Sequence, residues 1–274
     1  MTPIHTVAQV FDAIQQAKAG ASAFTTNFFP AERRLQGWIA HGELLGEFSD
    51  GVTFFLRRDR DFWRFYFCAA SVTALEQEAA KLAELKTERV MADLVGQETA
   101  LGALLVVLES AGFRRYGRLQ RMARSGPPGQ PPSADDEAPV AGADKADAPA
   151  ILELLEGSFD RYADQLPLLY EVEAAIESRQ MLVIKCNGAL AALLFFETHG
   201  FTSTIRYWVV AEPFRAHRFG AALMRHYFAS QTAVRRFLLW VAADNGDAVR
   251  KYRHYGYEPD GLLDHILANA TIRP

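Results

Sequence analysis

The stretch 207–257 decides the fold, and it reads YWVVAEPFRAHRFGAALMRHYFASQTAVRRFLLWVAADNGDAVRKYRHYGY. Together with the residues just before it, it opens on an apolar, β-branched run at 205–210, which is typical of a strand. The run passes through residues 212–214 into a turn and a helix start at 215–221. Apolar residues then recur at helical spacing, so we expect a helix that begins near Arg218. The first amides of a helix have no intrahelical partner and favour an anion such as a pyrophosphate.

A second strand and a second helix complete the stretch. The apolar run 237–241 predicts the strand, and Asn245 opens a helix that carries Tyr252. Gly256 marks the end of that helix, because glycine after the last helical turn is a common stop signal. The expected order is therefore strand, turn, helix, strand, helix.

The turn and the helix behind it resemble the central signature of the Gcn5-related N-acetyltransferases (GNAT). In that family a strand is followed by Arg/Gln-x-x-Gly-x-Gly/Ala, whose amides hold the pyrophosphate of acetyl-CoA. Arg215 and Gly220 match this pattern, whereas Arg218 stands where the first glycine is usual. The family's second signature, Asn-x-x-Ala-x-x-hydrophobic-Tyr followed by Gly-Phe, is similar to Asn245, Ala248, Tyr252 and Gly256-Tyr257. Lys251 replaces an apolar residue in it.

The resemblance implies transfer of an acetyl group from acetyl-CoA, as cosubstrate, to an amine. Backbone groups near Val209 and Val210 would orient the thioester and the pantetheine arm, and Asn245 would bond a pantetheine amide. Tyr252 would protonate the departing thiolate, since a phenol with a pKa of about 10 can donate that proton. The pyrophosphate would lie on the segment Arg215, Ala216, His217, Arg218, Phe219, Gly220 and Ala221.

Each of these residues also has a plain structural explanation. Tyr252 can simply pack a helix against the sheet, and Asn245 can be only an N-cap. Arg215 can be a solvated surface charge, and Gly220 can serve close helix packing alone. The sequence leaves both explanations open.

Glu197 is the best sequence candidate for a general base, because it ends a strand that we expect to border the cleft. An exposed strand-end carboxylate is the alternative. We expect no metal site, because no metal spacing with cysteines or carboxylates involves His217, His226, His254 or His265.

Composition favours a sizeable core, since 50% of the 274 residues are hydrophobic. Lys and Arg number 29 against 33 Asp and Glu, and the resulting net charge of -4 argues against a general nucleic-acid partner. We expect no membrane span, because no apolar run approaches about 18 residues, and the first residues lack the pattern of a signal peptide. Cys68 and Cys186 are expected to be free thiols of a cytoplasmic protein.

Residues 125–146 form the clearest boundary in the chain, because proline, glycine, small and acidic residues dominate them. Such a segment buries too little apolar surface to offset its ordering entropy, so we expect a flexible linker. The linker separates a first domain, 1–124, from a second domain, 147–274, which we expect to bind acetyl-CoA.

The two halves repeat one order of elements. Gly188 follows Gly51 by 137 positions and Gly256 follows Gly112 by 144, a drift of only seven residues. We therefore predict an α+β protein of two GNAT-like domains, each a mixed, mostly antiparallel sheet flanked by helices. Two unrelated α+β domains with shared turn chemistry are the alternative.

The first half lacks the residues that carry the resemblance in the second. Its third expected strand runs into Cys68-Ala69-Ala70-Ser71-Val72-Thr73, which contains neither the arginine nor the glycine. Its last helix has Val107 and Leu108 near the place that corresponds to Tyr252. We interpret this half as a degenerate copy that does not hold acetyl-CoA in the usual way.

An N-acetyltransferase that acts on a small or amino-acid-like amine is the leading hypothesis for function. A non-catalytic acyl-CoA-binding or interaction protein is the second hypothesis, because of Arg218 and the degenerate first half. A transferase that uses aminoacyl-tRNA is the third, and the lack of a basic excess counts against it. A homodimer is a further option, since the region from Phe54 to Phe67 is rich in aromatic residues.

Overall fold

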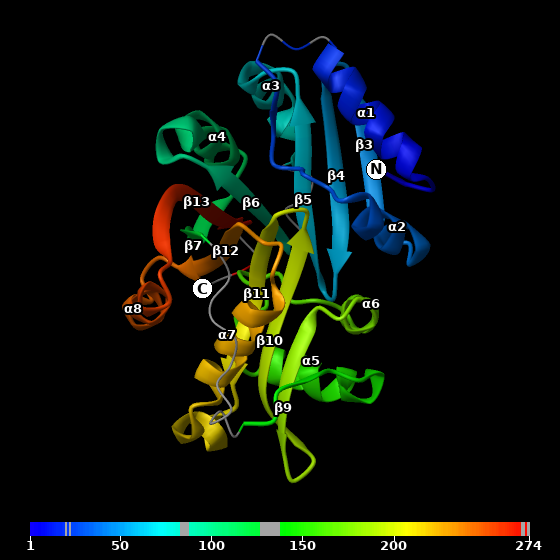
Figure 1. Cartoon of the computed structure of the whole chain (residues 1–274). Helices are drawn as coiled ribbons and strands as arrows, with labels where there is room; N and C mark the ends of the chain where they lie inside the picture. Colours follow the sequence, from blue (N-terminus) through cyan, green and yellow to red (C-terminus); the bar gives the residue numbers. More distant parts are fainter. Residues whose placement is uncertain (20, 22, 83–87, 127–137, 270–271, 273–274) are drawn as a thin grey trace. The chain divides into compact units, whose positions relative to one another are not determined.

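The computed structural model describes residues 1–19, 21, 23–82, 88–126, 138–269 and 272. They form two compact units: unit 1 contains Met1–Leu119 and Gly261–Pro274, and unit 2 contains Gln120–Asp260. Each unit is a mixed, mostly antiparallel sheet flanked by helices, which confirms the predicted α+β class (Figure 1).

Unit 1 carries two helices before its central hairpin and two after it. Its elements are β1 (Thr2–Pro3), α1 (Val7–Ala19), β2 (Thr25–Thr26), α2 (Glu32–Ala40), β3 (Leu44–Ser49), β4 (Val52–Asp59), β5 (Phe62–Ala69), α3 (Val72–Leu82), β6 (Val90–Gly96), α4 (Glu98–Ser110) and parts of β7 (Arg114–Ser125) and β13 (Glu258–Ala268). The strand order is β1-β3-β4-β5-β6-β13. Strands β5 and β6 are parallel, whereas β4 is antiparallel to β5 and β13 is antiparallel to β6.

Successive residues of a strand point to opposite faces of the sheet, and unit 1 places an apolar core on each face. Phe54 and Phe65 pack on the side of α3 and α4. Phe55 and Cys68 pack on the side of α1 and α2, together with Trp38. The nearly continuous apolar runs of β4 and β5 follow from this double coverage.

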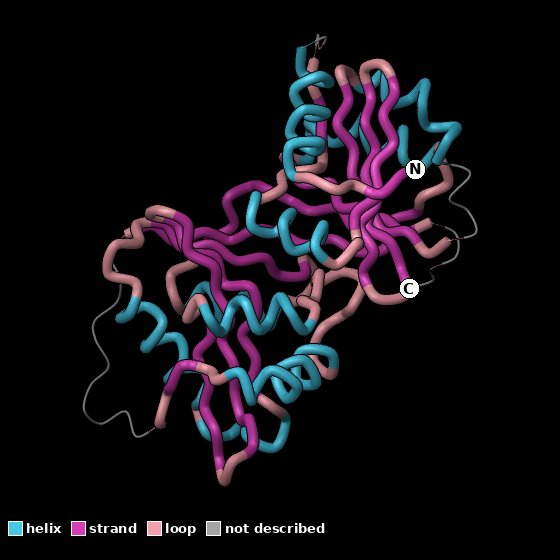
Figure 2. The backbone as a smooth tube through the Cα atoms, turned by 90° about the vertical axis from the view of Figure 1, so that its right-hand side faces the viewer, coloured by secondary structure: helices cyan, strands magenta, loops and turns pink. Residues whose placement is uncertain are grey.

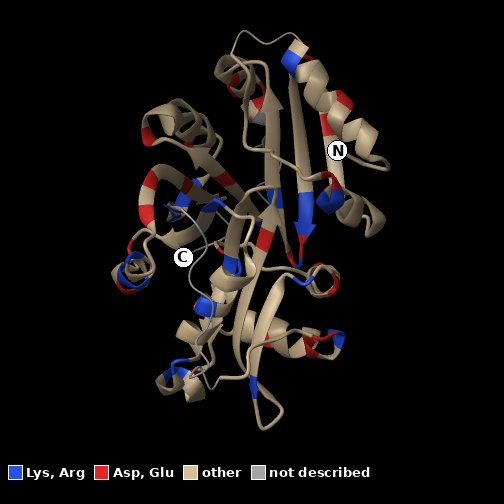
Figure 3. Ribbon diagram, viewed as in Figure 1, with Lys and Arg blue, Asp and Glu red and all other residues tan. Residues whose placement is uncertain are grey.

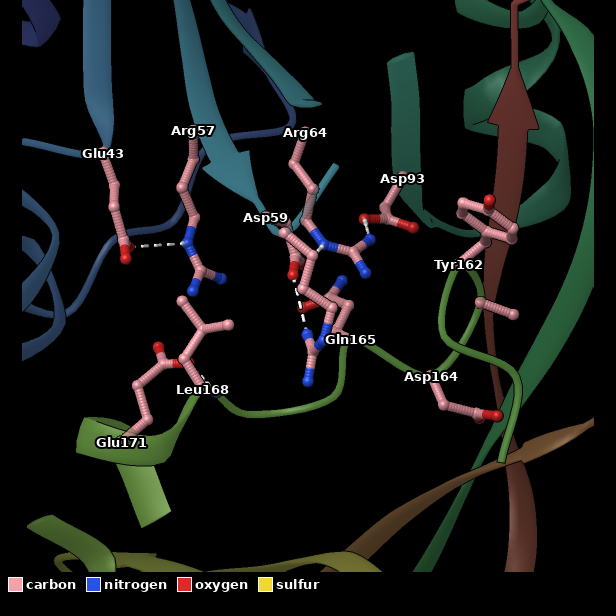
Figure 4. A network of polar contacts seen from close by, with 12 residues as sticks. Glu43, Arg57, Asp59, Arg64, Asp93, Tyr162, Asp164, Gln165, Leu168 and Glu171 are labelled. Carbon is pink, nitrogen blue, oxygen red and sulfur yellow. Dashed lines mark hydrogen bonds and ion pairs between the residues drawn. The ribbon is translucent and has the colours of Figure 1, made fainter. Parts of the chain in front are cut away.

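A charged row lies beyond the apolar residues on the α1 and α2 side of this sheet. Arg64 Nε donates to Asp59 Oδ2 at 2.8 Å, and Arg64 Nη1 lies 3.5 Å from Asp93 Oδ2 (Figure 4). Arg57, which is paired in register with Arg64, lies 3.7 Å from Glu43.

Asp264 of β13 adds a second carboxylate beside Asp93. The register places Asp264 opposite Val95 and Ile266 opposite Asp93, so the two carboxylates are diagonal neighbours on one face. Asp264 is buried, and its Oδ1 has no hydrogen-bond partner among the described residues. Burial first, and then the charge of Asp93, raises the pKa of Asp264 well above its ordinary value, although Arg64 opposes this effect.

Unit 2 repeats the helix, hairpin, strand, helix, strand, helix order. Its elements are the end of β7, β8 (Ala141–Gly142), η2 (Lys145–Asp147), α5 (Ala148–Glu156), α6 (Leu169–Glu177), β9 (Met181–Cys186), β10 (Ala189–His199), β11 (Thr202–Val210), η3 (Glu212–His217), α7 (Phe219–Ser230), β12 (Arg236–Ala242), α8 (Gly246–His254) and the start of β13. The strand order is β7-β12-β11-β10-β9-β8, in which β11 and β12 are parallel. Helices flank the strands of each unit (Figure 2).

The sheet of unit 2 also has a core on each face. Phe196 and Phe237 pack with α7 on one face. Phe195 and Tyr207 pack with α5 and α6 on the other. The expected hairpin turn at Asn187 and Gly188 is present, and both residues have positive φ.

Three features of the fold differ from the sequence-based expectations. The last strand, β13, was not predicted, and its residues from Gly261 onward belong to unit 1, although we expected the second domain to extend to 274. Residues 127–137 of the expected linker lie outside the described residues. Its end is folded, since Gly142 of β8 pairs with Leu182 of β9.

Acidic and basic residues occur on elements of both units (Figure 3). Among the described residues, none of the helices has the length and apolarity that crossing a membrane requires.

Candidate functional site

Strand β11 has an edge that β12 leaves open. The two parallel strands pair from Thr202 and Arg236 to Ile205 and Leu239. Among the described residues their register ends there, whereas β11 continues to Val210 against β10. Backbone groups of a strand beyond its register with a neighbour can pair with an extended ligand, and this part of β11 is suited to that.

A β-bulge at Arg206 lies where the two strands part. On the β10 side, Phe196 is opposite Ile205 and Phe195 is opposite Tyr207, so Arg206 is the extra residue of β11. Such a bulge bends its strand and increases the local twist. It therefore accounts for the departure of β11 from β12 after Ile205.

After Val210 the chain passes through a short 3-10 helix to the N-terminus of α7. The structure has the 3-10 helix η3 from Glu212 to His217, where it overlaps the start of the turn predicted at 215–221, and α7 begins at Phe219, near the expected Arg218. Ala221 N donates to Arg218 O at 3.0 Å, and the amides of Phe219 and Gly220 precede this first bond of the helix. Amides in this position, together with the helix dipole, favour an anion over a cation.

The loop before α7 carries exposed basic residues. Arg215, His217 and Arg218 are exposed, as is Ala216. The ring of His217 stacks on Phe219 with 5.3 Å between the ring centroids. The side chains of this loop therefore add positive charge beside the amides of α7.

Arg218 has a left-handed backbone conformation, with φ 57° and ψ 17°. This conformation is easy for glycine and costs other residues about 1–2 kcal/mol. The family signature has glycine at this position, so the structure gives the physical reason for that glycine and shows that an arginine here accepts strain.

Trp208 joins the strand, the start of α7 and α8. Its Nε1 donates to Gly220 O at 3.1 Å, and a Cβ on Gly220 would lie 3.0 Å from its Cζ2. Its ring lies 5.6 Å from that of Tyr252 and 5.6 Å from that of Tyr255. Trp208 was not among the predicted site residues. The only signal in the sequence is that Trp208 alternates with Val209 along the strand, so that their side chains point to opposite faces.

Tyr252 lies on α8 against Trp208, as its place in the second signature suggested. Burial first, and then the charge of Asp164, raises the pKa of Tyr252 to about 12. The phenol is therefore protonated at neutral pH and can donate a proton. Gly220 and Tyr252 therefore both lie against the indole of Trp208.

Asn245 caps α8. Its Oδ1 accepts from the amide of Ala248 at 3.0 Å, and α8 begins at Gly246. This geometry is that of the N-cap explanation. The Nδ2 group of the exposed side chain is not used in that cap.

Glu197 acts electrostatically on Arg206, which the sequence analysis did not single out. Burial alone would lower the pKa of Arg206, but the charge of Glu197, with smaller contributions from Tyr207 and Glu171, raises it above its ordinary value. Glu197 thus forms part of a charged group on β10 and β11. A β-bulge cannot be located from one sequence, which is why Arg206 was missed.

The loop between α5 and α6 is fixed to β11 by Tyr207. The Tyr207 hydroxyl lies 3.0 Å from Asp164 O and 2.8 Å from Gln165 O, and Gln165 has a φ of 49°. The Asp164 carboxylate accepts from the amide of Asp160 at 2.8 Å. Asp164 is therefore a second carboxylate near Tyr252, held by backbone contacts.

Within the described part of the chain, no group of three or more His, Cys, Asp or Glu residues is arranged to hold a metal ion. Cys68 and Cys186 are free thiols.

Comparison with known proteins agrees with this arrangement. Residues 148–257 match the model of the Acetyltransferase (GNAT) family. A search of curated proteins finds no match.

Solved structures share the fold. A "tandem GNAT protein from the clavulanic acid biosynthesis pathway (without AcCoA)" is 13% identical, with a TM-score of 0.62 over 100% of this chain and 98% of that chain. A GCN5-related N-acetyltransferase from Kribbella flavida is 18% identical, with a TM-score of 0.57 over 86% of this chain and 93% of that one. Another from Sphaerobacter thermophilus is 15% identical, with a TM-score of 0.57 over 96% and 91% of the two chains.

Proposed function

Because residues 148–257 form a domain of the GNAT acetyltransferase family, we propose that unit 2 binds acetyl-CoA and transfers its acetyl group to the amine of a small or amino-acid-like substrate. One observation carries the proposal. The part of β11 beyond its register with β12, which ends at Val210, leads through η3 to the amides that open α7. An extended arm that carries a pyrophosphate at one end fits these two features together.

Each part of acetyl-CoA has a group that suits it. The pantetheine amides pair with backbone groups near Val209 and Val210, and the pyrophosphate lies on the amides at the start of α7. The side chains of Arg215 and Arg218 add charge to that end. Asn245 Nδ2 is the remaining donor near the start of α8.

The chemical step forms one bond and breaks one. The amine nitrogen attacks the thioester carbonyl carbon, the C–S bond breaks, and the amine loses a proton. The departing thiolate takes a proton from the Tyr252 hydroxyl, which holds it at neutral pH.

Two carboxylates are candidates to accept the proton of the amine. Glu197, the sequence candidate, is close enough to Arg206 for its charge to act on the guanidinium. Asp164 is near Tyr252, and Tyr207 fixes its backbone. Glu197→Gln and Asp164→Asn distinguish them, because only the loss of the true base lowers kcat without weakening the binding of acetyl-CoA.

Calorimetric titration of acetyl-CoA into wild type, Arg215→Ala and Tyr252→Phe tests the proposal. We expect wild type to bind, Arg215→Ala to bind more weakly and Tyr252→Phe to bind normally but release thiol slowly with a panel of amines. Folded wild type that does not bind acetyl-CoA contradicts the proposal. Binding without turnover with any amine favours a non-catalytic acyl-CoA-binding protein instead.

A further inference from the structure

Unit 1 contains the same opening between parallel strands as unit 2. Strands β5 and β6 pair from Trp63 and Val90 to Phe65 and Ala92. Strand β5 continues to Ala69, as β11 continues to Val210. By the repeat of the fold, this is the place in unit 1 that corresponds to the open edge of β11.

In unit 1 this edge is occupied by the chain itself. Strand β4 pairs with β5 along its whole length, up to Val52 opposite Ala69, so it takes up the other edge. Strand β2 nevertheless pairs with Ala69 and Cys68 through Thr25 and Thr26. A strand has only two edges, so β2 lies on the edge that faces β6.

Asn27 fills the point where β5 and β6 part. Its Nδ2 donates to Phe65 O on β5 and to Asp93 O on β6, both at 3.1 Å. Its Oδ1 accepts from Phe67 N at 2.7 Å. The side chain is buried, and one carboxamide thus satisfies three backbone groups that the departure of the strands leaves free.

Thr26 closes the same edge one residue earlier. Its Oγ1 donates to Phe67 O at 2.6 Å and accepts from Phe28 N at 2.9 Å. Ala23 N donates to Ala70 O at 3.2 Å. The contacts therefore run from the parting of the strands to the end of β5.

A side chain of unit 1 also binds a backbone amide at the start of α3. Ser71 Oγ accepts from Ala74 N at 3.1 Å, which is an N-cap bond. The corresponding helix α7 has no side-chain cap, because Arg218 makes no such bond. An anion at α3 would have to compete with Ser71.

We propose that residues 23–28 are a built-in occupant of the acyl-CoA groove of unit 1, with the Asn27 carboxamide in the position of a ligand amide, so that the chain has one acyl-CoA site, in unit 2. This inference rests on the proposed function of unit 2. Unit 1 is then not a weak second acyl-CoA site, because its own residues 23–28 take the place of the ligand.

Binding stoichiometry tests the inference on the full chain. We expect one acetyl-CoA per chain in wild type and none in Ala221→Glu, whose carboxylate suits the first turn of α7 but repels a pyrophosphate. Ala150→Glu, which places the same carboxylate in the exposed first turn of α5, is the matched control and should bind one acetyl-CoA per chain. Two molecules per chain in wild type, or one remaining in Ala221→Glu, overturns the inference.

Amide hydrogen exchange tests the occupied groove independently of acetyl-CoA. We expect Phe67 N to exchange slowly in wild type, and in Asn27→Ala to exchange more than about tenfold faster at unchanged stoichiometry. Fast exchange of Phe67 N in wild type overturns the inference. If wild type binds no acetyl-CoA at all, the proposed function fails, and this measurement still decides whether the groove is occupied.

Discussion

The indole of Trp208 on β11 lies directly against Gly220 at the start of α7. It occupies the space that a side chain at position 220 would need. The Trp208 indole is held by its bond to Gly220 O and by the rings of Tyr252 and Tyr255. A Cβ at position 220 would lie 3.0 Å from Trp208 Cζ2, closer than an ordinary contact. This contact supports the explanation that Gly220 serves close packing at the start of the helix.

Gly220→Ala is expected to destabilise the protein by about 1–3 kcal/mol, because the held indole cannot move away from the added methyl group. Urea denaturation measures this change. Trp208→Leu provides the control: Gly220→Ala in that background should cost less, since the crowding atoms are gone. An equal cost in both backgrounds contradicts the packing explanation.

Arg218→Gly is expected to be more stable than Arg218→Ala by about 1 kcal/mol, because only glycine adopts the left-handed conformation without strain. Both variants lack the guanidinium, so the comparison isolates the backbone. If both also bind acetyl-CoA equally and more weakly than wild type, the Arg218 side chain contributes to binding. Equal stability of the two variants would show that the strain is relieved elsewhere.

Tyr252→Phe is expected to lower kcat by about 10²–10⁴-fold with little change in the affinity for acetyl-CoA, because it removes only the proton donor. The pKa of Tyr252 is raised to about 12 by burial and by Asp164, so the donor stays protonated as the pH rises. The wild-type rate should therefore show no loss from this group between pH 7 and about 10. A fall of kcat with an apparent pKa of about 10 would argue against Tyr252 as the donor.

Asp264→Asn is expected to stabilise the protein at pH 8 and to change little at pH 4. The folded pKa of Asp264 lies above its unfolded value, so folding binds a proton that the unfolded chain has lost. The contribution of protonated Asp264 to the free energy of unfolding is therefore complete below the unfolded pKa, and it is lost as the pH rises through the folded pKa. Denaturation of both proteins at the two pH values measures the difference, and an advantage of wild type that grows with pH would reverse the assignment.

The parts of the fold that the sequence predicts are those with local signals. The Asn187-Gly188 turn, the apolar runs and the helix start after Arg218 are encoded within a few residues. The pairing of β13 with β6 joins residues such as Ile266 and Asp93, which are far apart in the chain. No local pattern specifies such a partner.

The candidate site divides in the same way. Arg215, Gly220 and Tyr252 were predicted because they stand at motif spacing. Trp208 and Arg206 were missed because their importance depends on where β11 bends and what packs beneath it. Strand β2 was missed for a similar reason, since two threonines form a strand only because β5 offers a free edge.

The place of the last strand, which belongs to unit 1, bears on the order in which the two units fold. Unit 2 is one uninterrupted segment, Gln120–Asp260, whereas unit 1 needs β13 from the end of the chain to complete its sheet. Contacts within one continuous segment close shorter loops than contacts between its distant ends, so we expect unit 2 to fold before unit 1, in which β13 must first reach β6. A chain cut after Asp260 would keep the whole of unit 2 but would leave strand β6 of unit 1 without its partner β13.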